Sequence, residues 1–287
     1  MMGAQHAACG AGAWVAVAAD YDLPLSPITE PLVASMPWLS WLPDAVPLGF
    51  GLLDVGPAAV FMGAIICAGA ALLPDIDHHN ASIAHSLPPV SMILARFFKR
   101  ISGGHRRGTH SIAGVFFFGV VAWPASLLVI PDVATWGDLN IGAGLMAVIL
   151  SAFAFKTLHF MPDAARKTRW AAGVGVGILT LLFPHDQSWL IPCITLGVIV
   201  HIAGDILTKE GCNLLWPLRI RRPKHFKYLP AVRQVWGRNG HFAMPLLGSA
   251  HSIRSWVVTI PISAVAILGM LRAGTYWGQE LWATLMT

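Results

Sequence analysis

The chain has 287 residues, of which 55% are hydrophobic and only 11% are charged, and its mean hydropathy is +0.63. Soluble domains carry about 25% charged residues, so this composition excludes an ordinary soluble domain and favours an integral membrane protein. The sequence pI is near 9.3, but in a membrane protein the position of the basic residues matters more than their sum. We therefore expect the membrane, and no nucleic acid, as a partner.

The N-terminal segment does not have the pattern of a cleaved signal peptide, and the cysteines do not have the pattern of a disulfide framework or a zinc site. Residues 7–19 are apolar and end in small residues, as a signal peptide does, but no Lys or Arg precedes Arg96. A signal peptide begins with a basic region, so we expect this segment to be retained. No Cys-x-x-Cys pair is present, and we expect neither a disulfide framework nor a cysteine-type zinc site. The cysteines are Cys9, Cys67, Cys193 and Cys212.

Apolar segments follow one another along the whole chain. They cover residues 7–19, 56–74, 111–131, 141–160, 171–184, 188–204 and 255–271. The sequence therefore predicts an all-α, polytopic integral membrane protein with about seven transmembrane helices in one domain, 1–287. A spanning helix needs about 20 residues, with a lower limit near 17. The first and fifth segments are short by this measure, so an interfacial or re-entrant position is also open for them.

The basic residues of the loops predict the orientation. Lys and Arg gather in loops 75–110 and 205–253 and just after the fourth segment, whereas the intervening loops carry Asp and Glu with no Lys or Arg. By the positive-inside rule, the first group of loops is cytoplasmic. Seven crossings, with the N-terminus inside and the C-terminus outside, satisfy every loop and leave only Arg272 as a basic residue outside.

Histidine and aspartate concentrate at the ends of these segments, all on the predicted cytoplasmic side. We expect Pro74 to end the second segment, and Thr109 to cap the third segment with His110 in its first turn. His201 and Asp205 are four residues apart, so they share one face of a helix and can share a metal ion. The clusters are His6, Leu-Leu-Pro-Asp-Ile-Asp-His-His at 72–79, Gly-His-Arg-Arg-Gly-Thr-His-Ser at 104–111 and His-Ile-Ala-Gly-Asp at 201–205.

These residue types favour a metal centre. Neutral imidazole and carboxylate bind Zn²⁺ and similar divalent ions at about 2.0–2.2 Å. A site with ions about 3.5–4 Å apart activates water and neutralises an oxyanion, as phosphoester hydrolysis requires. A single His near a helix end is more often an interfacial residue with its hydrogen bonds satisfied. We place the histidines outside the clusters in that class: His159, His185, His225 and His241.

Three motifs carry a resemblance to a known family. They are Leu-Leu-Pro-Asp-Ile-Asp-His at 72–78, Gly-His-Arg-Arg-Gly-Thr-His-Ser at 104–111 and the sequence from His201 to Pro217. These motifs resemble the YdjM-type family of inner-membrane, metal-dependent hydrolases, which is placed with the zinc phospholipase C / P1 nuclease superfamily. The domain core then covers about 1–130 and 188–255, and 132–187 looks like a family-variable insert.

The resemblance implies a set of ligands and their cofactor. The cofactor is expected to be Zn²⁺, as two or three ions, with Mn²⁺ as the alternative. Asp75 and Asp77 are the catalytic candidates, and they cannot point in the same direction, so we expect Asp75 to bind metal and Asp77 to orient a histidine or the attacking water. Family members often have an acidic residue shortly after the Gly-Ser near position 248, whereas this chain reads Ala250-His251-Ser252, so either His251 replaces the acidic residue or the position is dispensable. The implied metal ligands are His6, Asp75, His78, His105, His110, His201 and Asp205.

The leading hypothesis is a phospholipase C-like phosphoesterase that acts on a phospholipid or lipid-linked phosphate at the cytoplasmic face of a bacterial inner membrane. The basic stretch 219–238 would hold an anionic headgroup, or would only attract anionic lipid at about 1 kcal/mol per basic residue. Ester or amide hydrolysis stays open. The alternatives are a divalent-ion transporter, which usually places ionisable residues near the midplane, and a metal-stabilised scaffold. The substrate-binding candidates are Arg106, Arg107, Arg221 and Arg222.

Overall fold

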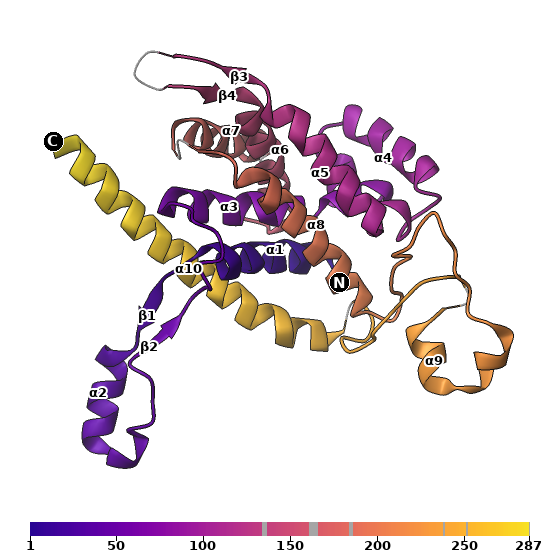
Figure 1. Cartoon of the computed structure of the whole chain (residues 1–287), viewed down its shortest axis with the longest axis horizontal. Coiled ribbons are helices and arrows are strands. Elements are labelled where there is room, and N and C mark those ends of the chain that lie inside the picture. The colour runs from indigo at the N-terminus through magenta and orange to yellow at the C-terminus, as the bar shows by residue number, and fades with distance from the viewer. Residues whose placement is uncertain (134–136, 161–165, 184–185, 238, 251, 287) are drawn as a thin grey trace.

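The structure is a computed structural model, and it describes residues 1–287 except 134–136, 161–165, 184–185, 238, 251 and 287. His185, Arg238 and His251 therefore lie outside the described residues. The described chain is mostly helical (Figure 1). Its α-helices are α1 (Gly3–Ala18), α2 (Ser26–Ser35), α3 (Pro57–Ala70), α4 (Val90–Ile101), α5 (Ile112–Ser126), α6 (Ile141–Thr157), α7 (Arg166–Leu182), α8 (Leu190–Ile206), α9 (Pro230–Val235) and α10 (Ile253–Met286).

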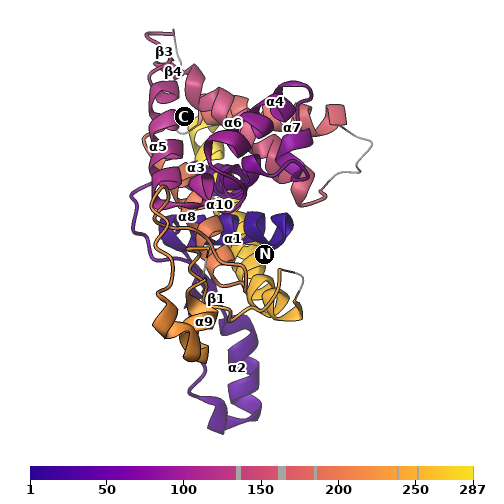
Figure 2. The same ribbon diagram turned by 90° about the vertical axis from the view of Figure 1, so that its right-hand side faces the viewer.

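Short strands and 3-10 turns connect these helices. Strand β1 (Asp22–Pro24) pairs with β2 (Ala45–Pro47), and β3 (Val129–Ile130) pairs with β4 (Leu139–Asn140), both antiparallel. The β1–β2 pair and α2 project away from the helical body (Figure 2). The 3-10 turns are η1 (Pro37–Leu39), η2 (Leu73–Asp77), η3 (Ser82–His85), η4 (Gly108–His110) and η6 (Lys224–Tyr228).

The predicted helical nature of the apolar segments is confirmed, because each of them contains one helix: α1, α3, α5, α6, α7, α8 and α10. Two stretches are long and apolar enough to cross a membrane by length and composition, Pro57–Asp77 and Ile253–Met286. The number of seven crossings stays a prediction. Helix α5, in the third predicted segment, ends at Ser126 rather than at 131, and α10 continues to Met286 rather than ending at 271.

Helices α1 and α3 form the centre of the bundle and contact α6, α8 and α10 (Figure 1). Trp14 of α1 is fully buried and donates a hydrogen bond to the carbonyl oxygen of Ala59 at 3.1 Å. Helix α8 lies so close to α3 that a Cβ atom on Gly197 would be 2.7 Å from the carbonyl oxygen of Cys67. This close approach brings the end of α8 against the turn that follows α3.

The prediction that Thr109 caps α5 is wrong. Ser111 is the capping residue, and its Oγ accepts a hydrogen bond from the backbone N–H of Gly114 at 3.1 Å. Ser111 has the extended backbone that an N-cap requires (φ −127°, ψ 170°), whereas Thr109 and His110 belong to η4, before the helix. The hydroxyl of Thr109 is thereby available to the neighbouring cluster.

Helix α4 was not among the predicted elements. Its exposed apolar side chains include Val90, Ile93, Leu94 and Phe97, which follow the spacing of one helical face. Three basic residues lie toward its C-terminal end, Arg96, Lys99 and Arg100. Such an apolar face beside basic residues is typical of a helix that lies along a membrane surface. Helix α4 contacts η2, which carries two of the predicted site residues.

Candidate metal centre

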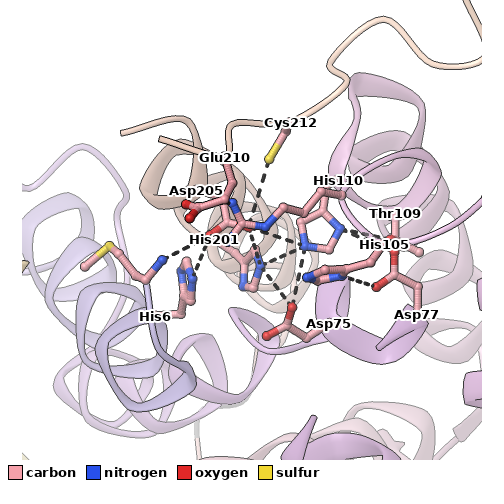
Figure 3. Close-up of polar contacts among 12 residues, drawn as sticks. His6, Asp75, Asp77, His105, Thr109, His110, His201, Asp205, Glu210 and Cys212 are labelled. Atoms are coloured by element: carbon pink, nitrogen blue, oxygen red, sulfur yellow. Dashed lines mark hydrogen bonds and ion pairs between the residues drawn. The ribbon is translucent and has the colours of Figure 1, made fainter. Parts of the chain in front are cut away.

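The structure brings the predicted His and Asp residues together from separate parts of the chain (Figure 3). Helix α1 supplies one of them near its N-terminus, η2 supplies two, the loop ending in η4 supplies two, and the last turns of α8 supply two. Contacts of η2 with both η4 and α8 hold these segments against one another. The residues are His6, Asp75, Asp77, His105, His110, His201 and Asp205.

One group of candidate ligands consists of His6, His201 and Asp205. All three side chains are buried, and one ligand atom from each lies within 4.8 Å of the others. Nε2 of His6 is 3.2 Å from Oδ1 of Asp205, and Nε2 of His201 is 3.8 Å from Oδ2 of the same carboxylate. The predicted shared face of His201 and Asp205 on α8 is therefore present in the structure.

The second group consists of Asp75, His105 and His110, whose ligand atoms also lie within 4.8 Å of one another. Nε2 of His110 is 3.6 Å from Oδ1 of Asp75. The two groups adjoin, because Nε2 of His110 is 3.1 Å from Nε2 of His201 and the same His201 atom is 3.7 Å from Oδ1 of Asp75. The arrangement thus offers two neighbouring ion positions.

Each of three histidines is held through its Nδ1 atom. Nδ1 of His201 donates to the carbonyl oxygen of Ala71 at 2.6 Å, and Nδ1 of His105 donates to Oδ1 of Asp77 at 2.8 Å. The hydroxyl of Thr109 donates to Oδ2 of Asp77 at 2.6 Å, so it accepts from Nδ1 of His110 at 3.0 Å. Fixing the Nδ1 proton in this way leaves Nε2 as the free ligand atom, as in many metal sites.

These contacts test whether the residues fit a divalent ion. With their protons on Nδ1, the rings of His110 and His201 turn the lone pairs of two Nε2 atoms toward each other at 3.1 Å, which is unfavourable unless a cation or proton lies between them. Around a tetrahedral ion with bonds of about 2.0–2.2 Å, ligand atoms are about 3.3–3.6 Å apart. The separations of 3.2–3.8 Å found between nitrogen and carboxylate oxygen atoms match this spacing. The donor set therefore fits Zn²⁺.

The electrostatics of His110 describe the same contact when no metal ion is bound. Burial alone would lower its pKa, but the carboxylates of Asp75 and Asp77, each 3.6 Å from a ring nitrogen of His110, outweigh burial and raise the pKa to about 9. A metal-free His110 is therefore protonated at neutral pH and can donate its second proton to His201. An ion that binds His110 has to displace this proton, because the ligand form of imidazole is neutral.

Arg106, a predicted substrate-binding residue, lies beside the cluster. In the structure its guanidinium group contacts the carboxylate of Asp205. Its Nη2 donates to Oδ1 of Asp205 at 3.2 Å, and its Nη1 donates to the hydroxyl of Thr208 at 3.1 Å. Nη1 also lies 3.6 Å from Oε2 of Glu210. Arg106 has a positive φ of 61°, which is a strained backbone conformation for a residue with a side chain. The loop therefore places this guanidinium group at a cost in conformational free energy.

The remaining predicted residues lie at the margin of the cluster or away from it. The ring of His78 is 4.6 Å from that of His105, centre to centre. Burial and His105 lower the pKa of His78, and among the residues that the structure describes no hydrogen bond or ion pair joins His78 to a carboxylate of the cluster. Arg107 donates to the carbonyl oxygen of Gly103 in its own loop. Within the described part of the chain, no hydrogen bond or ion pair joins Arg221 or Arg222 to the cluster.

The sequence reasoning missed the residues that support the ligands. Thr109 connects His110 to Asp77, although its place beside a histidine suggested only a helix cap. Cys212 is fully buried with Sγ 4.0 Å from Oδ2 of Asp205, and burial and that carboxylate raise its pKa. The only available signal for these two residues was their position inside the motifs.

This combination of a helical body, apolar membrane-type helices and an interior His/Asp cluster defines a membrane protein with a candidate metal centre. The chain belongs to the YdjM inner membrane protein family, which matches residues 1–278. Its relatives include the proteins named "Inner membrane protein YdjM" of Escherichia coli (strain K12) and Shigella flexneri. Each is 26% identical over 155 residues, which cover 52% of this chain and 46% of the relative. The chain thus spans about half the length of the curated relatives it matches. No solved structure matches it.

Proposed function

We propose that the chain is a membrane-embedded, metal-dependent hydrolase of a bacterial inner membrane, and that it cleaves a phosphoester bond of a phospholipid or lipid-linked phosphate. The observation that carries the proposal is the convergence of the Nε2 atoms of His110 and His201, 3.1 Å apart, beside the carboxylates of Asp75 and Asp205. Divalent ions held there would polarise a phosphoryl oxygen and make a water molecule more acidic. The placement in the zinc phospholipase C superfamily is part of this proposal.

The geometry supports different tasks for the two aspartates of η2. Both oxygens of Asp77 are occupied, one by His105 and the other by Thr109, and the side chain is fully buried. Asp77 therefore positions two histidines. Oδ1 of Asp75 lies 3.6–3.7 Å from the Nε2 atoms of His110 and His201, and its side chain is 22% exposed. Asp75 is thus a ligand at the accessible side of the cluster.

Two features favour a lipid as the substrate. The amphipathic helix α4 packs against η2, so a membrane surface would lie close to Asp75. An apolar pocket of about 580 Å³ also lies between α1, α8 and α10 and is lined by residues such as Ala16, Gly204 and Ile262. Gly204 directly precedes Asp205, so an acyl chain in this pocket would reach the neighbourhood of the metal centre.

The test uses the purified full chain in detergent, with bound metal and the products of a bacterial lipid extract measured in parallel. We expect turnover that a chelator abolishes and that Zn²⁺ or Mn²⁺ restores. The variants His201→Ala and Asp205→Ala should lose turnover and bind less metal, because each lacks a ligand. His159→Ala is the matched control, since His159 is exposed and distant in sequence from the motifs.

Two outcomes would contradict the proposal. Full metal occupancy in both the His201 and Asp205 variants would refute the ligand assignment. A protein that binds metal but turns over no lipid, ester or amide would refute the hydrolase and leave the transporter or the metal-stabilised scaffold. Metal-dependent ion flux through vesicles containing the protein would then identify the transporter.

A further inference from the structure

A second pocket, polar and basic, adjoins the metal centre on the side of Arg106. It has a volume of about 410 Å³, within the range of small-molecule sites. The segment that follows α8 forms one wall, and the end of α9 with the residues after it forms the other. We call it the basic pocket. It is lined by Arg106, Lys209, Glu210, Arg233, Gln234, Gly237, Asn239 and His241.

The charges of the basic pocket are not balanced within the protein. Glu210 is the one acidic side chain among the lining residues, and it faces Arg106 at 3.6 Å. Lys209 and Arg233 are exposed, and no ion pair reaches either side chain within the described part of the chain. The pocket thus carries a net positive charge that water and salt alone screen in the absence of a ligand. This charge predicts an anionic occupant.

His241 provides a second sign that the pocket receives a ligand. Its Nδ1 faces the carbonyl oxygen of Glu210 at 3.3 Å, so this nitrogen carries the proton. Its Nε2 is buried and has no hydrogen-bond partner, and an unmet buried polar atom is costly. Burial and the nearby guanidinium groups of Arg107 and Arg106 lower the pKa of His241. The neutral ring can therefore accept a hydrogen bond from an O–H group of a ligand.

The basic pocket and the metal centre share one side chain. Arg106 lines the pocket and donates to Oδ1 of Asp205 at 3.2 Å. Its guanidinium group therefore connects a ligand in the pocket with Asp205, a candidate metal ligand. The apolar pocket described above is lined in part by Gly204, which directly precedes Asp205 in the chain. A lipid with its acyl chain at Gly204 and its reacting phosphate at the metal centre would extend its headgroup toward Arg106.

We propose that the basic pocket binds a second anionic group of the substrate, a phosphate-type group on the headgroup, beyond the phosphate that reacts at the metal centre. This proposal rests on the proposed function. The substrate class is then a lipid whose headgroup carries an additional phosphate, in preference to a lipid with a zwitterionic headgroup. Lys209, which the sequence did not single out, and Arg233, from the basic stretch 219–238, replace Arg221 and Arg222 as headgroup-binding residues.

The test measures binding to the full chain, treated with Zn²⁺ and desalted, by titration calorimetry in detergent. The probes are two dihexanoyl lipids, one with a glycerol phosphate headgroup and one with a choline headgroup, each made as a phosphonate with a CH₂ group in place of the oxygen of the scissile bond so that no turnover occurs, and inorganic phosphate. The double variant Lys209→Gln/Arg233→Gln removes the unpaired charges of the pocket. The double variant Arg221→Gln/Lys224→Gln removes the same charge from exposed positions outside it and is the matched control.

We expect the dissociation constant for the glycerol phosphate lipid to rise about tenfold in the pocket variant and to stay within about twofold in the control, because phosphate contacts with cationic side chains are short-range and strong. Glu210→Gln should instead lower this dissociation constant several-fold, because it removes the one negative charge among the lining residues. The choline lipid should respond to none of these changes, and bound Zn²⁺ should stay the same in all variants.

Equal weakening in both double variants would overturn the proposal, because it would show only a general effect of net charge. Weaker binding in Glu210→Gln would also overturn it. Inorganic phosphate that binds as tightly as the phosphorylated lipid, with the same loss in the pocket variant, would overturn the assignment to a lipid headgroup. Because binding is measured without turnover, a protein that binds the lipid through this pocket but hydrolyses nothing would refute the proposed hydrolase separately.

Discussion

Replacing Thr109 by Val tests whether the hydroxyl positions His110 for metal. The change keeps the shape of the side chain but removes the 2.6 Å bond to Asp77 and the 3.0 Å bond with Nδ1 of His110. A buried hydrogen bond to a charged group is worth about 1.5–3 kcal/mol. Each 1.4 kcal/mol corresponds to about tenfold in affinity, so we expect Zn²⁺ to bind about 10–100-fold more weakly, the range found when supporting residues of metal sites are changed.

The assay is competition for Zn²⁺ between the purified protein and a chelator of known affinity, with thermal unfolding recorded on the same samples. Thr109→Ser keeps the hydroxyl and should stay close to wild type. Thr180→Val is the control, because Thr180 is fully buried but its hydroxyl bonds only to Val176 and Met62, on α7 and α3. A Thr109→Val protein whose Zn²⁺ affinity lies within about twofold of wild type would refute the reasoning.

Three further predictions follow from the same structure. Reporter fusions at Asp44 and Pro223 should report opposite sides of the membrane, because the basic residues lie only in the loops of one side. Asp75→Asn should lose bound metal and turnover together, whereas Asp77→Asn should keep metal at saturating Zn²⁺ with about 10–100-fold weaker affinity, as metal analysis and kcat will show. Gly197→Ala should lower the free energy of unfolding by about 1–3 kcal/mol, measured by denaturant unfolding, and weaken Zn²⁺ binding because it moves α8 away from α3.

Each of these predictions has a decisive contrary result. Reporters on the same side would exclude the seven-crossing topology. Equal loss of metal in the two aspartate variants would make both residues ligands and end the division of tasks. For Gly197, the control is Gly175→Ala on α7, where an added Cβ meets no atom within 4 Å and stability should not fall. An unchanged midpoint for Gly197→Ala would show that α8 and α3 are not in close contact.

The sequence predicted the helices well, because an apolar run has a strong signal and needs no knowledge of its neighbours. It also predicted most of the His and Asp residues that meet, from their positions at segment ends on one side of the membrane and from the family resemblance, whereas the predicted ligand His78 lies at the margin of the cluster. The supporting hydroxyl of Thr109 was not predictable in the same way. Thr109 and Ser111 are both good capping residues, and only the backbone of the loop decides that Ser111 caps α5.

The basic residues show the same limit. Sequence proximity favoured Arg221 and Arg222 for the substrate because they lie in a dense basic stretch, but the fold directs Lys209 and Arg233 to the pocket instead. Helix α4 was missed because its longest continuous apolar run, from Met92 to Ala95, is too short to stand out as a membrane segment. Its amphipathic pattern is weak in a hydropathy profile, although its spacing could have been read directly.

The two ends of the candidate centre are far apart in the order of synthesis. Asp205 of α8 completes a group that begins with His6 of α1, while a bond from Gln5 to Ser255 at 2.8 Å connects the same turn of α1 to α10. A chain emerges from its N-terminus at about 5–20 residues per second, so α1 is synthesised well before α8 and α10. The group of His6, His201 and Asp205 is therefore incomplete until α8 has been made, so an ion at this position would be bound late in synthesis, whereas Asp75, His105 and His110 are present earlier.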